Sequence, residues 1–184
     1  MRRFCALFLM GFIFCLVLQD LSPAEMRNLA LQLDGKDDYV QLPSGIFRHL
    51  SQATVEAWVK WERFGYFSQP FGFGNGEKWQ AMAINNSLYN PDLQYYIYDN
   101  LKLSLIKVPK ILRIGQWYHI AAVSGGGGMK LYLNGVMVGE HEYSGSFSSI
   151  GNDEHNYIGR PLWSANEYFK GQIDEVRVWG VARS

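Results

Sequence analysis

Two adjacent carboxylates, Asp174 and Glu175, lie in the stretch Gly171–Trp179 (GQIDEVRVW), which otherwise has the composition of a strand. Successive side chains of a regular strand point to opposite faces, so these two carboxylates should diverge. Glycosidic cleavage needs two carboxyl groups that converge on one cleft, which a strand provides through an acid-x-acid spacing. The nearest approach to that spacing is Glu140–Glu142, just past a hairpin strand with no further acid nearby. The pattern therefore argues against a catalytic acid/base pair.

The apolar residues around these two acids change phase. Val176 shares a face with Asp174, whereas Ile173 shares a face with Glu175. If Ile173 and Val176 both face the core, a β-bulge at the acidic pair must shift the strand by one residue. Arg177 lies on the same face as Glu175, so we expect an ion pair between them.

A second acidic group, Asp34, Asp37 and Asp38, is clustered within five residues of a turn. Carboxylates this close repel one another unless they are solvated or bound to a cation. Calcium prefers hard oxygen ligands, and loop carboxylates supply them, although the spacing is not that of an EF-hand. A solvated Asp-Gly turn explains the same residues equally well, so both readings stay open.

Aromatic residues are the remaining candidates for binding. Tyr96 and Tyr98 alternate and therefore share one face of their strand. Trp79, Trp163 and Tyr168 lie in segments rich in Gly and Asn. Core packing is the commoner use of such rings, and stacking on sugar rings is the other. We retain Tyr96, Tyr98 and Trp163 as candidate ligand-binding residues.

The chain begins with a basic Met1–Arg3 and an apolar run of about fifteen residues, followed by a small-x-small site that ends at Ala24. This pattern predicts a secretory signal peptide over residues 1–24 and a secreted, periplasmic or cell-surface protein, and a signal anchor is the alternative. The apolar run is shorter than the about twenty residues that span a bilayer, so we expect no membrane span after cleavage.

Removal of that segment changes the chemistry that the chain can support. Cys5 and Cys15 leave with it, so the mature chain has neither a disulfide nor a thiolate. Lys plus Arg falls from 17 to 15 and Asp plus Glu from 17 to 16, a net charge of about −1. Nucleic acid is therefore not an expected partner. Asn85 begins a glycosylation sequon, which matters only in a eukaryotic secretory route.

The remaining chain, residues 25–184, reads as short strands with Gly, Asn and Asp turns, which indicates one all-β sandwich or jelly-roll domain. The expected strands include Ala30–Leu42 (broken at its Asp-Gly turn), Ala53–Trp61, Leu93–Asn100, Lys102–Val108, Trp117–Val123, Met129–Gly135, Val136–Tyr143, His155–Gly159 and Gly171–Trp179. Gly125–Gly128 lacks a following Gly-Lys-Ser/Thr and predicts a hairpin loop, not a phosphate site. Ser44–Leu50 can form at most a short helical turn, and residues 144–168 suggest long surface loops.

Four blocks together resemble the laminin G-like domain of the concanavalin A-like lectin/glucanase superfamily, to which pentraxins are related. They are LALQLDGKDDYVQLP, ATVEAWVKW, GQWYHIAAVSGGGGMKLYLNGVMVG and FKGQIDEVRVWGVARS, in this order. The resemblance implies a two-sheet antiparallel jelly roll whose first and last strands are neighbours. It also implies a calcium ion held by Asp34 and Asp174, with Gly35 as a carbonyl ligand and Asp37 and Asp38 from the same acidic turn.

The sequence thus predicts a secreted, non-catalytic module that binds carbohydrate or a glycoconjugate and holds a structural calcium. A protein–protein adhesion or assembly domain that binds surface proteins is the alternative. A glucanase on the same fold is the third, and it lacks the alternating acidic motif. Whether residues 1–184 are a whole protein or a piece of a larger surface protein stays open.

Overall fold

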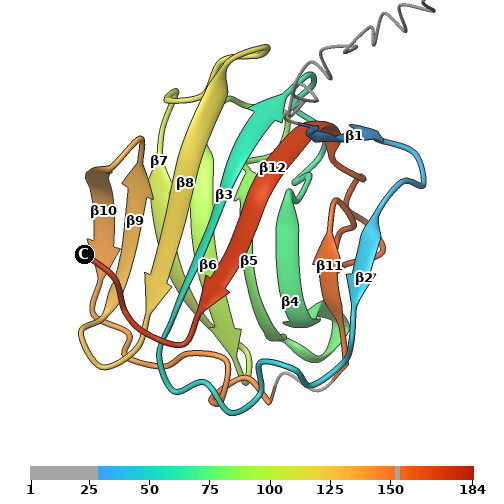
Figure 1. Ribbon diagram of the computed structural model, residues 1–184. Helices are drawn as coiled ribbons and strands as arrows, with labels where there is room; N and C mark the ends of the chain where they lie inside the picture. Colours follow the sequence, from blue (N-terminus) through green and yellow to red (C-terminus); the bar gives the residue numbers. More distant parts are fainter. Residues whose placement is uncertain (1–28, 152–153) are drawn as a thin grey trace, which may run out of the picture.

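The computed structural model describes residues 29–151 and 154–184, which form two antiparallel six-stranded sheets packed face to face (Figure 1). The expected signal peptide lies outside the described residues. Sheet A contains, in spatial order, β1 (Leu31–Asp34), β12 (Lys170–Trp179), β3 (Ala53–Trp61), β8 (Trp117–Ser124), β9 (Met129–Leu133) and β10 (Val136–His141). Sheet B contains β2 (Val40–Leu42), β11 (Asn156–Ile158), β4 (Phe71–Asn75), β5 (Gln80–Asn86), β6 (Leu93–Asp99) and β7 (Lys102–Val108). The predicted all-β jelly-roll sandwich is confirmed.

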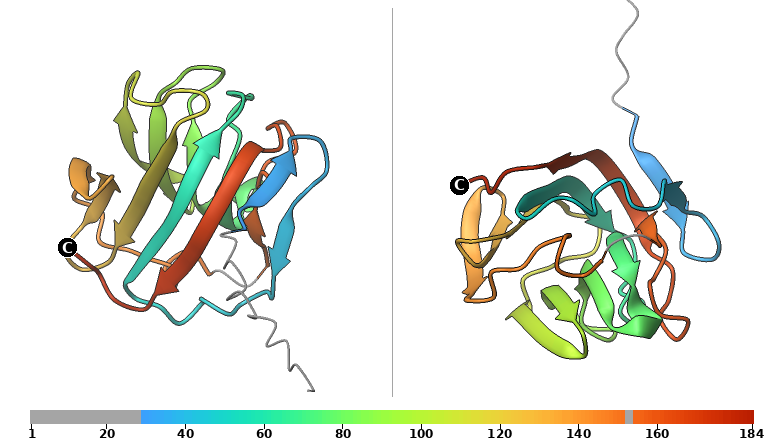
Figure 2. Two further views of the ribbon diagram at one scale, coloured as in Figure 1. Left: turned by 45° about the horizontal axis from the view of Figure 1, so that its top comes forward. Right: turned by 90° about the horizontal axis from the view of Figure 1, so that it is seen from below.

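Alternating side chains build the core between the sheets. In β3, Val55, Ala57, Val59 and Trp61 are fully buried and belong to one hydrophobic cluster with residues of both sheets. The view from below in Figure 2 shows the sheets as two layers, with β1 and β2 on one side and β9 and β10 on the other. The outer face of each sheet is thereby left for contacts other than the main core.

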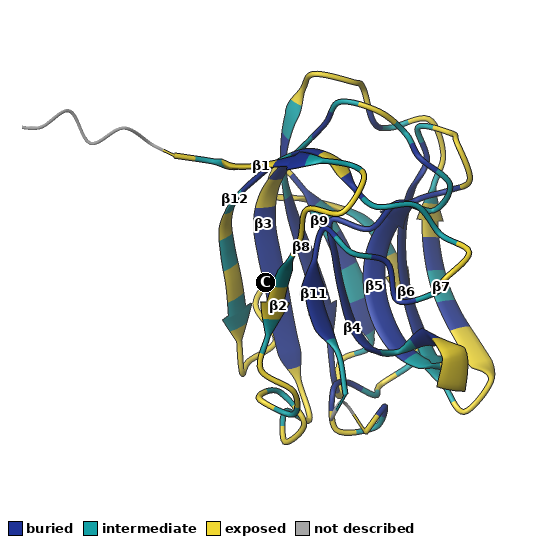
Figure 3. Ribbon diagram, turned by 90° about the vertical axis from the view of Figure 1, so that its right-hand side faces the viewer, coloured by how far each residue is buried: buried dark blue, intermediate teal, exposed yellow. Residues whose placement is uncertain are grey.

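The sequence pattern does not indicate two strands of sheet B, β4 (Phe71–Asn75) and β5 (Gln80–Asn86). Their sequences, FGFGN and QAMAINN, contain the Gly and Asn residues that indicate turns. Nearly every residue of both strands is buried, so neither shows the alternation of a half-exposed strand (Figure 3). The single helical element in the described part of the chain is the 3₁₀ turn η1 (Gly76–Lys78) between them. Ser44–Leu50 contains hydrogen-bonded turns but no helix.

The predicted β-bulge in β12 is present. The register of β12 against β3 shifts between Asp174 and Arg177, and Glu175 has a φ of 54°. Ile173 is buried, and Val176 packs against the same core cluster from the other side of the bulge. The expected ion pair between Arg177 and Glu175 also forms.

The strand connections agree with the turn chemistry of the sequence. Asn134 and Gly135 both have positive φ and join β9 to β10, as the primed turns of tight hairpins require. The loop Gly125–Gly128 joins β8 to β9. The first and last strands pair along the edge of sheet A, with Leu31 opposite Ile173. Residues 144–151 and 154–168 are mostly loop around β11, but Phe147, Ile150 and Leu162 in them are buried.

Candidate functional site

The outer face of sheet B carries a second hydrophobic cluster, separate from the main core. Because β6 alternates, Tyr96 and Tyr98 point outward. Their cross-strand neighbours in β5 are the small residues Ala83 and Ala81. Two alanines beside two tyrosines leave space above β5, and residues from the connecting segments occupy part of it. The prediction that Tyr96 and Tyr98 share a face is confirmed.

Four aromatic rings meet above this cluster, and we call them the aromatic quartet: Trp79, Tyr96, Tyr98 and Trp163. The Trp163 ring centroid lies 5.6 Å from both tyrosine rings and 6.3 Å from the ring of Trp79. Trp79 meets Tyr98 edge to face at 5.0 Å. These are the separations and angles that aromatic pairs prefer. The structure thus brings together the three candidate ligand-binding residues, Tyr96, Tyr98 and Trp163, and places Trp79 beside them.

Trp79 is placed by the 3₁₀ turn η1. The Asn75 side chain caps this turn by accepting from the Lys78 backbone N–H at 3.2 Å, and the Trp79 N–H donates to the Gly76 carbonyl at 2.8 Å. The turn ends with Trp79 in the left-handed region, at φ 55°. This left-handed conformation is a common way to end a helical turn, although it is costly for a bulky residue. It leaves the Trp79 side chain 40% exposed beside the hollow.

Trp163 is placed by two buried polar contacts and one close approach. The Gln69 side chain donates to the Tyr96 hydroxyl at 2.6 Å and accepts from the Leu162 N–H at 2.9 Å, which ties the Trp163 loop to β6. Gly76 lies directly against Trp163, because a Cβ built on it would be 2.6 Å from the indole ring. Only glycine leaves the indole in this position without a shift.

The quartet borders a hollow of about 390 Å³ on the outer face of sheet B. Its ten lining residues are Phe67, Trp79, Asn85, Gln94, Tyr96, Tyr98, Leu103, Leu105, Trp163 and Asn166. None of these ten carries a charge, and three of them are carboxamides. The volume falls in the range of small-molecule sites, which combine apolar walls with a few placed polar groups.

Asn85 lines the hollow and carries a buried hydrogen-bond acceptor without a partner. Its side chain is only 2% exposed, and its Oδ1 has no hydrogen-bond partner among the described residues. Gln94, its cross-strand neighbour in β6, is 8% exposed and lines the same hollow. A buried acceptor without a partner is costly unless a ligand or water supplies a donor. Asn85 drew attention in the sequence only as a sequon, and no local pattern there indicated a binding site.

The predicted calcium residues of the first turn gather on the surface. Oxygens of the Asp34, Asp37 and Asp38 carboxylates all lie within 4.8 Å of one another. The Lys36 backbone N–H donates to Asp34 at 2.8 Å, and this bond lowers the pKa of Asp34. Gly35 makes the turn at φ 77°, against Lys170 of β12. Three carboxyl groups in one turn fit the hard-oxygen preference of calcium.

Asp174 does not join this turn. In the register of β1 with β12, Asp34 lies opposite Lys170. Asp174 is four residues farther along β12, about 13 Å away at the rise of a strand. It borders a different hollow, on the outer face of sheet A, together with Trp58 and Trp117. The expectation that Asp34 and Asp174 converge is therefore wrong, because the strand register separates them.

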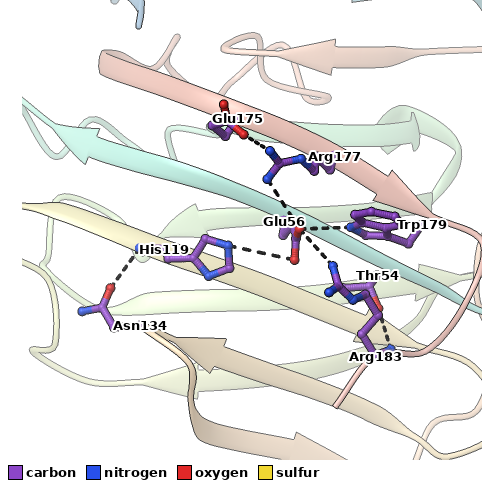
Figure 4. Close-up of polar contacts among 8 residues, drawn as sticks. All are labelled: Thr54, Glu56, His119, Asn134, Glu175, Arg177, Trp179 and Arg183. Atoms are coloured by element: carbon purple, nitrogen blue, oxygen red, sulfur yellow. Dashed lines mark hydrogen bonds and ion pairs between the residues drawn. The ribbon is translucent and has the colours of Figure 1, made fainter. Parts of the chain in front are cut away.

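The outer face of sheet A also holds a charge cluster centred on Glu56 (Figure 4). The Glu56 carboxylate accepts from Trp179 Nε1 at 3.0 Å and from Arg183 at 3.2 Å, and Arg177 lies 3.9 Å away. His119 Nε2 is 4.0 Å from its other oxygen. One oxygen of Glu56 thus has three N–H neighbours, from Trp179, Arg183 and Arg177. This arrangement holds β12 and the segment after it against β3.

Comparisons with known proteins agree with this architecture. Residues 34–184 match the laminin G model described as the concanavalin A-like lectin/glucanases superfamily. A search of curated proteins found no match. No helix among residues 29–151 and 154–184 has the length and apolar character to cross a membrane.

Three solved structures share the fold at low sequence identity. The CBM40 module of a Ruminococcus gnavus IT-sialidase, bound to α2,3-sialyllactose, has a TM-score of 0.72 and 15% identity, covering 84% of this chain and 91% of its own. A SAP-like pentraxin from Limulus polyphemus has a TM-score of 0.63 and 20% identity over 88% and 80%. Domain 4 of the Geobacillus stearothermophilus arabinanase AbnA, in complex with arabinotriose, has a TM-score of 0.61 and 22% identity over 84% and 72%.

Proposed function

Because the chain belongs to the concanavalin A-like lectin/glucanases superfamily, we propose that it is a non-catalytic carbohydrate-binding module whose ligand lies on the aromatic quartet of sheet B. The observation that carries the proposal is the hollow itself. It combines the exposed Trp79 and the partly buried Tyr98 and Trp163 with Asn85, whose buried Oδ1 has no hydrogen-bond partner among the described residues. Sugars present an apolar face of C–H groups and an edge of hydroxyl groups, so this combination matches them.

Each side of the hollow has a distinct part in binding. Trp79, 40% exposed, offers an indole surface for the apolar face of a sugar ring. The carboxamides of Asn85, Gln94 and Asn166 offer both donors and acceptors to hydroxyl groups. The Gly76 contact and the Gln69 bridge hold the rings in place before a ligand arrives, which lowers the entropic cost of binding. No step of bond cleavage is assigned to these residues.

The similar structures support this proposal at the level of ligand class. The sialidase module and the arabinanase domain have the fold of this chain and were solved with bound oligosaccharides. Both belong to larger glycan-degrading proteins by their descriptions. We propose for this chain the corresponding role of holding a secreted or surface protein on a glycan.

Calcium remains part of the proposal, with a revised ligand set. Asp34, Asp37 and Asp38 would bind the ion through their carboxylates, and the Gly35 carbonyl is the expected fourth ligand. An ion bound only by the folded protein raises the melting temperature by mass action. Chelator should therefore lower the melting temperature of the protein, and Asp34→Ala should remove that response while Asp174→Ala retains it. An identical melting temperature with and without chelator would refute the calcium proposal.

The test of carbohydrate binding uses two tryptophans of equal exposure. Trp79 is 40% exposed on sheet B and Trp58 is 41% exposed on sheet A. The purified protein is applied to a broad glycan panel, and Trp79→Ala is compared with Trp58→Ala on every glycan bound. We expect Trp79→Ala to abolish binding and Trp58→Ala to retain it. Absence of binding across the panel, or equal loss in both variants, would refute the proposal.

Protein recognition is the second candidate function, and the outer face of sheet A favours it. Trp58 and Trp117 border a hollow of about 610 Å³ there, beside Asp174 and Glu175. An adhesion or assembly domain would use such exposed rings against a protein partner. Pull-down from surface extracts that depends on Trp58 and not on Trp79 would support this candidate.

A further inference from the structure

We infer that the hollow on sheet B selects uncharged glycans and discriminates against sugars with a carboxylate, sulfate or phosphate on the ring that it holds. This inference rests on the proposed function and narrows its ligand class. Its first basis is the composition of the site, because none of the ten lining residues is a cation. An anionic group placed there would lose hydration without an opposite charge in return, which disfavours its binding.

The second basis is the hydrogen-bonding polarity of the site. Asn85 Oδ1 is buried and unpartnered, so the ligand group that satisfies it must donate a hydrogen. A sugar hydroxyl donates and accepts, whereas an ionised carboxylate or sulfate only accepts. An anionic group facing Asn85 Oδ1 would therefore place acceptor against acceptor. A hydroxyl at the same point would relieve the unsatisfied oxygen.

The third basis is the charge at the rim of the quartet. The Glu77 carboxylate accepts from the Ser164 backbone N–H at 2.9 Å, directly after Trp163 in the chain. This bond lowers the pKa of Glu77, so the group is anionic at neutral pH. The Glu77 carboxylate thus adjoins Trp163 of the quartet and would repel an anionic ligand.

Two cationic side chains near the rim do not reverse this balance. Lys78, which precedes Trp79, is paired with Glu154. Lys107, which shares a face of β7 with Leu103 and Leu105 and lies opposite Gln94, is paired with Asp92 at 3.1 Å. Neither is among the residues that line the hollow. Fold likeness to a module bound to sialyllactose therefore does not carry over to ligand charge, because this hollow lacks a cation.

The test compares matched neutral and anionic glycans on the intact protein. Each neutral oligosaccharide bound in the panel is paired with its sialylated or sulfated form, with lactose and α2,3-sialyllactose as one pair. We expect at least about tenfold tighter binding of the neutral member, equivalent to about 1.4 kcal/mol. We also expect little change in affinity between low and high salt, because the complex has no ion pair to screen.

Two variants sharpen this comparison. Asn85→Ala removes the unpaired acceptor and should weaken binding of neutral glycans about tenfold, provided that its melting temperature shows a folded protein. Leu103→Lys places a cation at a 44% exposed position of the hollow and should narrow the neutral-to-anionic ratio. The Leu103 site is exposed, so this variant should fold even if Asn85→Ala does not.

The results distinguish failure of charge selection from failure of carbohydrate binding itself. If glycans bind in a Trp79-dependent way but the anionic members bind as tightly as the neutral ones, charge selection is wrong and the proposed function stands. If no glycan binds, the proposed function fails together with the inference. If Leu103→Lys leaves the ratio unchanged, the missing cation is not the cause of selection.

Discussion

Replacement of Gly76 by alanine tests whether the position of Trp163 determines binding. A Cβ on Gly76 would lie 2.6 Å from both the Leu162 carbonyl and the Trp163 ring, whereas ordinary contact begins at about 3.4 Å. The ring and the loop must therefore move by about 0.8 Å. Overpacking of this kind costs about 1–3 kcal/mol of folding free energy. For a domain of this size, that corresponds to a fall in melting temperature of about 2–12 °C.

Binding should weaken in the same variant, because the displaced Trp163 no longer continues the stacking surface. The assay is thermal melting together with glycan affinity, measured on Gly76→Ala and on a control variant. Gly126→Ala is the control, since a Cβ there meets nothing within 4 Å and the loop is exposed. A Gly76→Ala protein with unchanged melting temperature and unchanged affinity would refute the claim that Gly76 fixes the ring.

Three further predictions concern the polar contacts of the sandwich. Tyr96→Phe leaves the buried Gln69 amide without its 2.6 Å acceptor and should cost about 1–3 kcal/mol, measured by urea unfolding; an unchanged midpoint would contradict the bridging role. Glu56→Gln removes the negative charge that Arg177 and Arg183 share and should lower the melting temperature. An unchanged melting temperature would show that the charge cluster in Figure 4 does not stabilise the fold. The Lys110 backbone N–H, which donates to Asp92 at 2.9 Å, and the Lys107 side chain lower the pKa of Asp92. The ionised Asp92 should therefore stabilise the fold at neutral pH, and this stabilisation should be lost as the pH falls below about 4. Asp92→Asn should therefore destabilise at about pH 7 and make little difference at about pH 2, which unfolding titrations at both values would show.

The strands could be predicted where apolar and polar residues alternate in the sequence or where aromatic and branched residues are frequent. Ala53–Trp61 and Lys102–Val108 were read from their patterns with the bounds that the structure has. The phase change at Asp174 even indicated the bulge, because two core residues on opposite faces demand one. Phe71–Asn75 and Gln80–Asn86 could not be found in this way. Both strands are buried nearly throughout, and their small and amide residues resemble turn composition.

Individual residues of the site on sheet B could be predicted from the sequence, but their meeting in one aromatic quartet could not. Alternation showed that Tyr96 and Tyr98 share a face, and composition placed Trp163 in a loop. Their meeting with Trp79 depends on β5, which lacks a strand pattern, and on a left-handed residue after a 3₁₀ turn. For Asp174, the family resemblance suggested that it meets Asp34 at a calcium ion, but the strand register separates the two residues.

The two outer faces of the sandwich differ in how far their polar groups are satisfied. On sheet A, one oxygen of the buried Glu56 accepts from Trp179 and Arg183, and the other lies 4.0 Å from His119 Nε2. On sheet B, Asn85 is buried more deeply and its Oδ1 has no partner among the described residues. A buried acceptor without a partner costs about 1–3 kcal/mol, so a ligand that donates a hydrogen to it would stabilise the protein. This unsatisfied oxygen beside the aromatic quartet is the reason that we propose sheet B, and not the more highly charged sheet A, as the face that meets a ligand.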